Sequence, residues 1–292
     1  MNILVTGCNG QLGNHLRMAA TSSKHNFFFT DIDTLDITDV DAVGSFFRSN
    51  AIDLTINCAA YTNVDRSEDE EDVADRVNHH AVAILANATR EMGGVLIQIS
   101  TDYVFGGDAY NTPCNEQLPT NPTGAYARTK LRGEEAIIAS GCRYIIVRTA
   151  WLYSEYGKNF VKTMLNITGS RAECRVVYDQ VGTPTYAGDL AKTLLHIVDT
   201  PDLARLTGIY NYSNEGVCSW FDFAKEIARQ AGHTACDIQP CRSSEFPSKV
   251  VRPSYAVLDK SKIKKTFGLR IPYWTDSLSV CIKNIVDGGI CS

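Results

Sequence analysis

The sequence predicts an α/β protein whose first part is a doubly wound parallel sheet and whose second part is a smaller, mixed α/β domain. Two observations support this fold class. Short apolar runs alternate with longer amphipathic stretches through the first half of the 292-residue chain, and the alternation becomes irregular after residue 148. Strands that alternate with helices form parallel sheets with helices on both faces. We therefore place one domain at residues 1–150 and a second at residues 151–292, and expect a return to the first domain at about residues 176–200.

Five apolar runs in the first half have the length of strands. They lie at residues 2–6, 26–30, 54–59, 95–100 and 144–149. The stretches between them show the spacing of apolar positions that is typical of amphipathic helices. These stretches are residues 11–20, 40–48, 73–92 and 126–139. Right-handed crossovers between the parallel strands then cover both faces of the sheet.

The second half has fewer regular signals. Helices are predicted at residues 158–167, 188–198 and 275–286, and strands at residues 174–178 and 208–212. A further helix lies within SWFDFAKEIARQAG, where Ser219 suits the N-cap position and Gly232 follows the last turn. Residues 234–252 are polar and rich in turn formers, so we expect turns there.

Composition excludes several classes of function. The net charge is −5 and no basic run occurs, so the sequence lacks the electrostatic footprint of a nucleic-acid-binding protein. No stretch approaches the roughly 18 apolar residues of a membrane span, and the N-terminus lacks the basic region of a signal peptide. The ten cysteines include no Cys-x-x-Cys pair. We therefore expect reduced, mostly buried thiols and a cytoplasmic location.

Three glycines precede the first predicted helix. In VTGCNGQLG, Gly7, Gly10 and Gly13 recur at every third position, directly after the first predicted strand. Glycine permits a tight turn and the close approach of a pyrophosphate to a helix N-terminus. Such a pattern can be a plain turn, but its place between a strand and a helix is typical of a dinucleotide-binding, Rossmann-type fold.

The second predicted strand ends in two carboxylates, Asp31 and Asp33. An acidic residue in this place can accept hydrogen bonds from the hydroxyls of the adenine ribose. No arginine or lysine lies within several residues to hold a 2′-phosphate, so the pattern favours NAD over NADP. The alternative is that both aspartates are solvated turn residues.

A tyrosine and a lysine share one face of the fourth predicted helix. Tyr126 and Lys130 are four residues apart in YARTK. An ammonium group beside a phenol lowers the phenol pKa, so Tyr126 could exchange a proton with a substrate oxygen at neutral pH. The preceding strand ends in STDYVF, at the edge where open parallel sheets bind ligands. We expect Thr101 to meet Tyr126 there.

The next two residues could contact the ligands. Asp102 would orient a substrate hydroxyl and Tyr103 would line the nicotinamide side. The alternative is that Asp102 is a turn aspartate and Tyr103 a half-buried aromatic.

Ordered blocks along almost the whole chain resemble the extended short-chain dehydrogenases, and among these the dTDP-4-dehydrorhamnose reductase family. The first block is the glycine turn TGCNGQLG. The next blocks are LDITD, INCAAYTNVDRSE, ISTDYVF, NPTGAYARTKLRGE and RTAWLY, followed by NFVKTML, DQVGTPTYAGDLA and RPSYAVLDKSKI. The substrate-facing loop GGDAYNTPCNE is one residue longer than the usual pattern of the family.

The resemblance implies Thr101, Tyr126 and Lys130 as the catalytic residues. It implies NADH or NADPH as the cofactor, bound by Tyr126 and Lys130 together with residues of the first domain. The implied cofactor residues of that domain, with the glycines of the turn, are Gly7, Gly10, Gln11, Leu12, Gly13, Asp31, Asp36, Ile37, Ala60, Tyr61 and Thr62. For the substrate it implies Thr101, Asp102 and Trp151, although Trp151 could instead serve simple core packing.

The implied reaction is the reduction of the C4 carbonyl of dTDP-4-dehydro-6-deoxy-L-mannose to dTDP-L-rhamnose, a step of dTDP-rhamnose biosynthesis. The implied partners are the nucleotide-sugar substrate and a second copy of the chain in a homodimer. His15 stands where some members carry an acidic residue associated with a metal, so no metal is expected. His79 and His80 are adjacent in the third predicted helix, and adjacent residues there do not share a face. We therefore expect packing or surface roles for both.

Two other functions fit the same resemblance. A nucleotide-sugar dehydratase or epimerase regenerates its NAD within each turnover, and a 4,6-dehydratase of this type typically places Asp and then Glu after the threonine. Here Tyr103 follows Asp102. More distantly, the chain resembles the non-catalytic regulatory subunit of methionine adenosyltransferase. The intact Thr101, Tyr126 and Lys130 favour an enzyme, and Tyr103 in place of a second carboxylate argues against a dehydratase.

Overall fold

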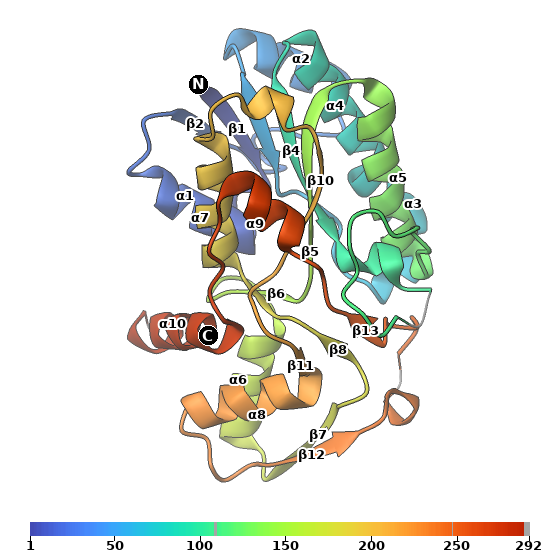
Figure 1. Cartoon of the computed structure of the whole chain (residues 1–292), viewed down its shortest axis with the longest axis vertical. Helices are drawn as coiled ribbons and strands as arrows, with labels where there is room; N and C mark the ends of the chain where they lie inside the picture. The colour runs from blue at the N-terminus through green and yellow to red at the C-terminus, as the bar shows by residue number, and fades with distance from the viewer. Residues whose placement is uncertain (108–109, 247, 289–292) are drawn as a thin grey trace.

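A six-stranded parallel sheet forms the centre of the molecule (Figure 1). The computed structural model describes residues 1–107, 110–246 and 248–288. The strands follow the order β10-β5-β4-β3-β1-β2, and every neighbouring pair is parallel. Their bounds are β1 (Asn2–Thr6), β2 (Asn26–Phe29), β3 (Leu54–Asn57), β4 (Val95–Thr101), β5 (Arg143–Thr149) and β10 (Gly208–Tyr212). The predicted doubly wound α/β fold is confirmed, and the strand order reverses direction between β1 and β3, where ligands bind such sheets.

The alternation of side chains along each strand produces two apolar faces. In β1, Ile3 and Val5 belong to the cluster on one face, and Leu4 belongs to the cluster on the other. This is the two-residue period of an extended chain. Both faces are therefore buried, which explains the continuous apolar runs in the sequence.

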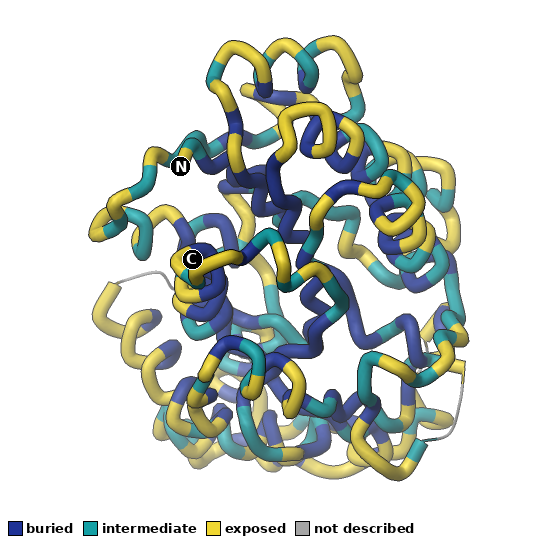
Figure 2. The backbone as a smooth tube through the Cα atoms, turned by 45° about the horizontal axis from the view of Figure 1, so that its top comes forward, coloured by how far each residue is buried: buried dark blue, intermediate teal, exposed yellow. Residues whose placement is uncertain are grey.

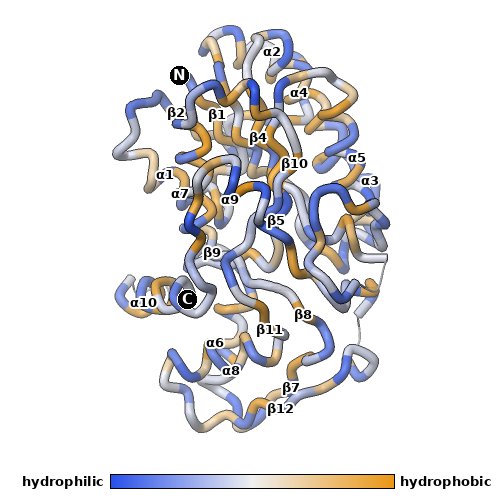
Figure 3. Tube along the Cα trace, viewed as in Figure 1, coloured by the Kyte–Doolittle hydropathy of each residue, from blue (hydrophilic) through white to orange (hydrophobic). Residues whose placement is uncertain are grey.

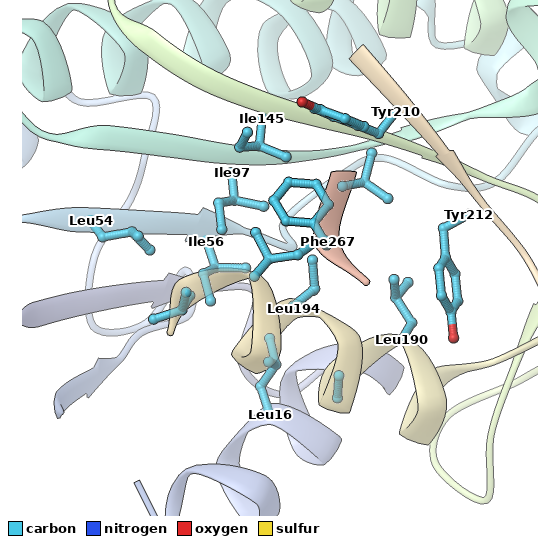
Figure 4. Packing of buried hydrophobic residues seen from close by; sticks show 14 of the residues in the cluster. Leu16, Leu54, Ile56, Ile97, Ile145, Leu190, Leu194, Tyr210, Tyr212 and Phe267 are labelled. Carbon is cyan, nitrogen blue, oxygen red and sulfur yellow. The ribbon is translucent and has the colours of Figure 1, made fainter. Parts of the chain in front are cut away.

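Helices from distant parts of the chain cover the two faces. One face packs against α1 (Gln11–Ala20), α7 (Ala187–Val198) and α9 (Ser261–Phe267). The other packs against α2 (Val40–Ser49), α4 (Ala81–Glu91) and α5 (Gly124–Ser140). Figure 4 shows the first cluster, in which strand side chains meet those of the three helices; its labelled members are Leu16, Leu54, Ile56, Ile97, Ile145, Leu190, Leu194, Tyr210, Tyr212 and Phe267.

The helix expected at residues 73–92 is divided into three parts. An α-helix, α3 (Glu71–Asp75), passes into a π-helical turn, η2 (Arg76–His80), and then into α4. The buried Asn78 side chain in this turn accepts a hydrogen bond from the Tyr61 amide and donates to the Tyr61 carbonyl and the Thr129 hydroxyl. A Cβ at Gly133 would lie 2.2 Å from the Asn78 carbonyl oxygen, so α5 approaches the turn closely. The turn therefore connects the loop after β3 to α5.

A second apolar cluster lies beyond the carboxyl edge of the sheet. Its helices are α6 (Phe160–Ser170), α8 (Trp220–Gln230) and α10 (Trp274–Asp287), and its two-stranded sheet pairs β7 (Glu173–Val177) with β12 (Asp237–Cys241). Ser219 caps α8 through a capping box with Asp222, which confirms the predicted start of this helix. Figures 1 and 3 show these elements at the end of the molecule opposite α2, with mixed polar and apolar positions along the helices.

Short strand pairs connect the two parts. They are β6 (Leu152–Tyr153) with β9 (Thr185–Tyr186), and β8 (Val181–Gly182) with β11 (Cys218–Ser219) and β13 (Tyr255–Ala256). The remaining short helices are η1 (Arg66–Glu68), η3 (Asp102–Phe105), η4 (Leu203–Arg205) and η5 (Ser243–Glu245). Figure 2 shows that the buried backbone is concentrated in the centre of the molecule.

Other parts of the chain also differ from the sequence-based expectation. The return to the main sheet includes β10 and α9 as well as α7, so it extends beyond residues 176–200, and Val176 at the start of that range belongs to the second cluster. Strand β12 lies where turns were expected; it pairs with β7 and buries Ile238 and Cys241, while the residues between them are exposed. Helix α9 was not predicted, since seven residues give too short a periodic signal.

Two further expectations, on free thiols and on membrane-spanning segments, can be compared with the structure. The nine cysteines among the described residues are free, and seven of them are buried. Within residues 1–107, 110–246 and 248–288, no helix has the length and apolar character that a membrane crossing requires. The loop that begins at Gly106 was expected to be one residue longer than in the family. Its residues 108–109 lie outside the described part of the chain.

Candidate active site

The glycine turn between β1 and α1 packs closely against neighbouring backbone atoms. Gly7 has a φ of +62°, and a Cβ there would lie 2.6 Å from the Ala59 amide nitrogen. A Cβ at Gly13 would lie 2.5 Å from the Cys8 Cα. Gly10 is the N-cap of α1 and offers no side chain to its first amides. Those N–H groups therefore stay available for an anionic ligand, which is the chemistry expected of a pyrophosphate site.

A cavity of about 440 Å³ extends from this turn along the ends of β1 and β2. Its lining includes the predicted cofactor residues Gly7, Gly10, Asp31, Asp36, Ile37 and Ala60. Asp31 accepts a hydrogen bond from the Asn9 amide at 2.9 Å, so the carboxylate also ties the end of β2 to the glycine turn. Hydrogen bonds from the Thr38 amide and hydroxyl lower the pKa of Asp36. Both carboxylates stand at the rim, where a ribose could reach them.

A positive charge does lie near this end of the site, contrary to the argument that favoured NAD. The guanidinium of Arg17, on α1, sits 5.0 Å from the ring centroid of Phe29 and donates to Cys8 Sγ at 2.9 Å. Phe29 is the last residue of β2, two positions before Asp31. The fold brings the arginine there from a different element, so its proximity could not be read from the residues around Asp31.

A second cavity of about 590 Å³ continues from the glycine turn to the ends of β4 and β5. Its lining includes Thr101, Asp102, Tyr103, Tyr126, Lys130 and Trp151, together with Gly7, Gly10, Gln11, Leu12, Gly13, Ala60 and Thr62. The three residues expected to be catalytic therefore open into one cavity with most of the expected cofactor residues. Their individual roles stay predictions.

Thr101 ends β4 and organises the turn that follows. Its hydroxyl accepts a hydrogen bond from the Tyr103 amide at 3.2 Å and donates one to Asp102 Oδ1 at 3.0 Å. Asp102 is 3% exposed, and its Oδ2 has no hydrogen-bond partner among the described residues. Burial raises the pKa of Asp102 to about 7. An unpaired, buried carboxyl oxygen in a cavity is suited to a ligand hydroxyl.

Tyr126 enters the cavity from the first turns of α5. Burial raises its pKa above that of a free phenol, while a hydrogen bond with the Thr101 side chain acts in the opposite direction. The ring of Tyr126 also meets that of Tyr103 edge to face, with 5.6 Å between centroids. The phenol is therefore fixed in orientation and remains protonated at neutral pH.

The expected effect of Lys130 on the tyrosine is not present in this structure. The Lys130 ammonium donates to the Ile99 carbonyl at 2.7 Å, and burial lowers its pKa to about 8. The pKa of Tyr126 is raised rather than lowered, because loss of hydration outweighs the nearby polar groups. A neutral phenol is nevertheless the state that a proton donor requires.

A buried ion pair supports this end of the sheet. Arg148 on β5 binds the Glu134 carboxylate of α5 in a two-pronged arrangement, with Nη2 2.6 Å from Oε2 and Nε 3.0 Å from Oε1. The Ser100 hydroxyl on β4 donates to the same carboxylate at 2.5 Å. The Glu134 carboxylate also favours the charged form of Lys130, one helical turn earlier. The pair thus joins the three elements that present Thr101 and Lys130, and sequence reasoning missed it because its partners are 14 residues apart.

Trp151 both packs and lines the cavity. It has a φ of +49°, and its indole stacks on that of Trp220 with 3.6 Å between ring centroids and 14° between planes. A Cβ at Gly182 would lie 2.8 Å from the Trp151 ring, so glycine is required behind it. One ring face is therefore covered, and the side chain still belongs to the cavity lining.

Tyr61 does not join the other expected cofactor residues. The Tyr61 hydroxyl donates a hydrogen bond to Glu70 Oε2 at 2.6 Å, and Tyr61 lines neither of the two cavities. Its backbone is held by Asn78 instead. Asp33 is exposed and lines neither cavity, which agrees with the alternative that it is a solvated turn residue.

Two groups of contacts were missed by the sequence argument. Asn159, the N-cap of α6, donates to the Gln11 side chain at 3.0 Å, and Ser154 donates to the same oxygen at 3.1 Å. Arg252 interacts with the Tyr103 side chain and donates to Asp65 at 3.0 Å. The blocks NFVKTML and RPSYAVLDKSKI contain Asn159 and Arg252, so their place in the resemblance was the available signal.

His15 lies beside the cavity in a buried polar group. Its Nε2 is 3.0 Å from Glu155 Oε2, and the Tyr186 hydroxyl and Asn284 amide donate to the same carboxylate. The histidine is thus paired with a single carboxylate here. The cluster links α1 to β9 and α10.

The fold and the two cavities together define the class of the protein. A glycine turn at one end of a crevice, and a threonine, a tyrosine and a lysine at the other, are the arrangement of an extended short-chain dehydrogenase or reductase. The family model described as "RmlD substrate binding domain" matches residues 1–286. The chain belongs to this family.

Named relatives agree with this assignment. A dTDP-4-dehydrorhamnose reductase of Mycolicibacterium smegmatis is 38% identical over 285 residues, which cover 97% of this chain and 86% of the relative. A solved dTDP-4-dehydrorhamnose reductase of Clostridium acetobutylicum has a TM-score of 0.93 and 42% identity, covering 98% of this chain and 100% of that chain. The structure of the Bacillus anthracis enzyme in complex with NADP has a TM-score of 0.91 and 35% identity, covering 97% and 99%.

Proposed function

We propose that this protein reduces the C4 carbonyl of dTDP-4-dehydrorhamnose and forms dTDP-L-rhamnose, with NADH or NADPH as the reductant. The observation that carries the proposal is that Thr101, Tyr126 and Lys130 line one cavity with the glycine turn. The relatives that cover nearly the whole chain bear the name of this activity.

The first cavity fits a dinucleotide. The turn excludes side chains at Gly7 and Gly13, and α1 presents uncapped amides beyond Gly10. Asp31 at its rim offers acceptors for a ribose, and Lys130 offers donors in the second cavity, which adjoins the first at the glycine turn. A reduced nicotinamide bound there supplies the hydride for the carbonyl carbon.

The side chains of the chain supply the proton and the orientation. Tyr126, kept neutral by burial, donates its proton to the oxygen that gains negative charge. Thr101 holds the Tyr126 hydroxyl and offers a second contact to that oxygen. Donors directed at developing negative charge are worth roughly 3–4 kcal/mol each in related reactions. Lys130, still largely charged at neutral pH, stabilises the phenolate that remains.

Asp102 and Trp151 form the substrate side. The unpaired Oδ2 of Asp102 is available to a sugar hydroxyl, and the indole of Trp151 forms a flat wall on the same cavity. Arg252 reaches this side from the opposite end of the chain through its contact with Tyr103. Together they would select a hydroxylated ring next to the reacting carbon.

The decisive experiment combines the purified protein with dTDP-4-dehydrorhamnose and either NADH or NADPH. We expect one reduced nicotinamide to be consumed for each dTDP-L-rhamnose formed, with the product identified by mass and NMR. Conversion of a nucleotide sugar without net consumption of the nicotinamide would instead identify an epimerase or dehydratase. Stable association with a methionine adenosyltransferase and no turnover of any nucleotide sugar would identify a regulatory subunit.

The cytoplasmic location and the homodimer stay predictions. Light scattering coupled to size-exclusion chromatography measures the mass of the assembly directly. A mass near that of two chains supports the homodimer, and a mass near that of one chain contradicts it.

A further inference from the structure

The π-helical turn η2 brings two adjacent histidines to one carboxylate. Residues adjacent on an α-helix point about 100° apart. Here the rings of His79 and His80 stack, with 4.4 Å between centroids. His79 Nδ1 and His80 Nε2 each lie 3.2 Å from Oδ2 of Asp75. The expectation that these neighbours do not share a face was wrong, since their rings stack and both reach the same carboxylate within the π-helical turn.

We propose that Asp75, His79 and His80 form a binding site for a divalent transition-metal ion such as Zn²⁺ or Ni²⁺. Imidazole nitrogen and carboxylate oxygen are ligands that these ions prefer. Two ligands at about 2.1 Å from a tetrahedral ion lie about 3.4 Å apart, close to the two separations of 3.2 Å.

The two histidine nitrogens form the third pair of ligand atoms, and one of the two rings is free to adjust. The three ligand atoms lie within 4.8 Å of one another, whereas ligands of one ion can be at most about 4.2 Å apart. His80 is exposed, so rotation of its ring can close the difference. Across residues 1–107, 110–246 and 248–288, no other set of three His, Cys, Asp or Glu side chains has such an arrangement.

Neighbouring charges orient the carboxylate and limit the affinity. Arg132 of α5 donates to Asp75 Oδ1 at 2.9 Å, which leaves Oδ2 directed at the histidines. Such outer contacts fix metal ligands in place. The guanidinium also repels a cation, but Glu71 lies 3.7 Å from it and pairs with Arg128 at 2.7 Å. We therefore expect a moderate, micromolar affinity.

The site lies on the outer side of a turn whose inner side supports the candidate active site. Asn78 separates Asp75 from the histidines in sequence and holds the Tyr61 backbone and Thr129. Thr129 directly precedes Lys130. An ion that bridges Asp75 and His80 spans the turn from end to end, so binding should stabilise the folded state.

The test is a titration of the tag-free, full-length protein with Zn²⁺, followed by calorimetry. We expect one ion per chain at this site, with an affinity lowered at least about tenfold in His80→Ala. His25→Ala is the matched control, because His25 is also paired with an aspartate, Asp199, at 3.1 Å. That variant should bind as the unchanged protein does. Saturating Zn²⁺ should raise the Tm of the unchanged protein and of the control, but raise it less in His80→Ala.

A second probe separates this site from the ten cysteines. Co²⁺ bound to imidazole and carboxylate gives visible bands without the charge-transfer absorption of thiolate ligands. Thiolate absorption, equal Zn²⁺ affinity in His80→Ala, or no binding at micromolar Zn²⁺ would each overturn the proposal. The last result would mean that the cluster is held together only by the contacts of the two histidines with Asp75. None of these outcomes depends on whether the protein reduces a nucleotide sugar.

Discussion

The two ends of the crevice shift the pKa values of carboxyl groups in opposite directions. At the reaction end, Asp102 is buried, and burial raises its pKa to about 7. At the nucleotide end, Asp36 is exposed, and hydrogen bonds from Thr38 lower its pKa. One carboxyl is therefore poised to exchange a proton near neutral pH, and the other is held ionised as a permanent acceptor.

The same contrast extends to the neighbouring side chains. Burial raises the pKa of Tyr126 and lowers that of Lys130 to about 8. Asp31, by contrast, accepts hydrogen bonds from the amides of Asn9 and Ile32 at a partly exposed position. Dehydration shifts groups towards their neutral forms, while backbone donors favour the charged form. The proposed proton transfer and the proposed nucleotide binding would therefore take place in different electrostatic environments.

The largest effect should come from Tyr126→Phe. This change removes the proton donor without altering the ring, so turnover should fall by a factor on the order of 10²–10⁴ while dinucleotide affinity is kept. Steady-state kinetics and dinucleotide titration measure the two quantities. Tyr144→Phe, on β5 and away from both cavities, is the control. Near-normal turnover in Tyr126→Phe would remove the donor assignment.

The ion pair behind the reaction end should be costly to break from one side. In Arg148→Met, Glu134 keeps a buried charge without its partner, so the free energy of unfolding should drop by about 3–5 kcal/mol. The double variant Glu134→Met with Arg148→Met removes both charges and should recover much of that loss. Urea unfolding of both variants checks the prediction. Equal losses in the single and double variants would show that packing, and not charge, is responsible.

Asp102 should make stability depend on pH. Its pKa in the folded protein is about 7, against an ordinary value of 3.8. Between these two values the folded state holds a proton that the unfolded state has released, so the free energy of unfolding falls as the pH rises from 4 to 7. The fall is at most about 4 kcal/mol, since each unit of pKa corresponds to about 1.4 kcal/mol. It should be missing from Asp102→Asn.

Denaturant unfolding at pH 5 and pH 8 measures this difference. Relative to Asp102→Asn, the unchanged protein should be more stable at pH 5 than at pH 8. Parallel pH profiles for the two proteins would mean that Asp102 is ionised in the folded state throughout.

The smallest effects concern the choice of dinucleotide. Asp31→Ala should weaken NADH by about tenfold, and NADPH less, because a charged acceptor for the ribose diol is lost. Arg17→Ala should weaken NADPH more than NADH if its guanidinium reaches the 2′-phosphate. Asp33→Ala is the control, because Asp33 lines neither cavity. Titrations monitored by fluorescence give all the affinities. If Asp31→Ala weakens both equally, Asp31 does not hold the diol.

Local signals were sufficient to predict most of the sheet. The strands at residues 2–6 and 208–212 and the helix at residues 11–20 have the predicted bounds, because period-two and helical patterns are strong there. Ser219 also marks the start of α8 correctly. The glycine turn, Thr101 and Tyr126 could be placed in one crevice since the ends of parallel strands meet at one edge.

Contacts between distant segments could not be predicted in this way. The charge of Arg17 beside Phe29, the pairing of Glu134 with Arg148, and the π-helical turn at residues 76–80 all depend on which elements become neighbours. The Tyr126 pKa also depends on burial, which the four-residue spacing from Lys130 does not reveal. Sequence patterns indicate which residues belong to the candidate site, whereas the packing around these residues determines their pKa values and ion pairs.

The stacked indoles of Trp151 and Trp220 give the molecule an internal optical reporter. Two indoles stacked 3.6 Å apart are close enough to couple their electronic transitions, so we expect this pair to contribute to the near-ultraviolet circular dichroism. Because Trp151 also borders the second cavity, a sugar nucleotide bound there is expected to perturb one of the two stacked indoles directly. The chain contains only three tryptophans, so this signal can be followed without any attached dye.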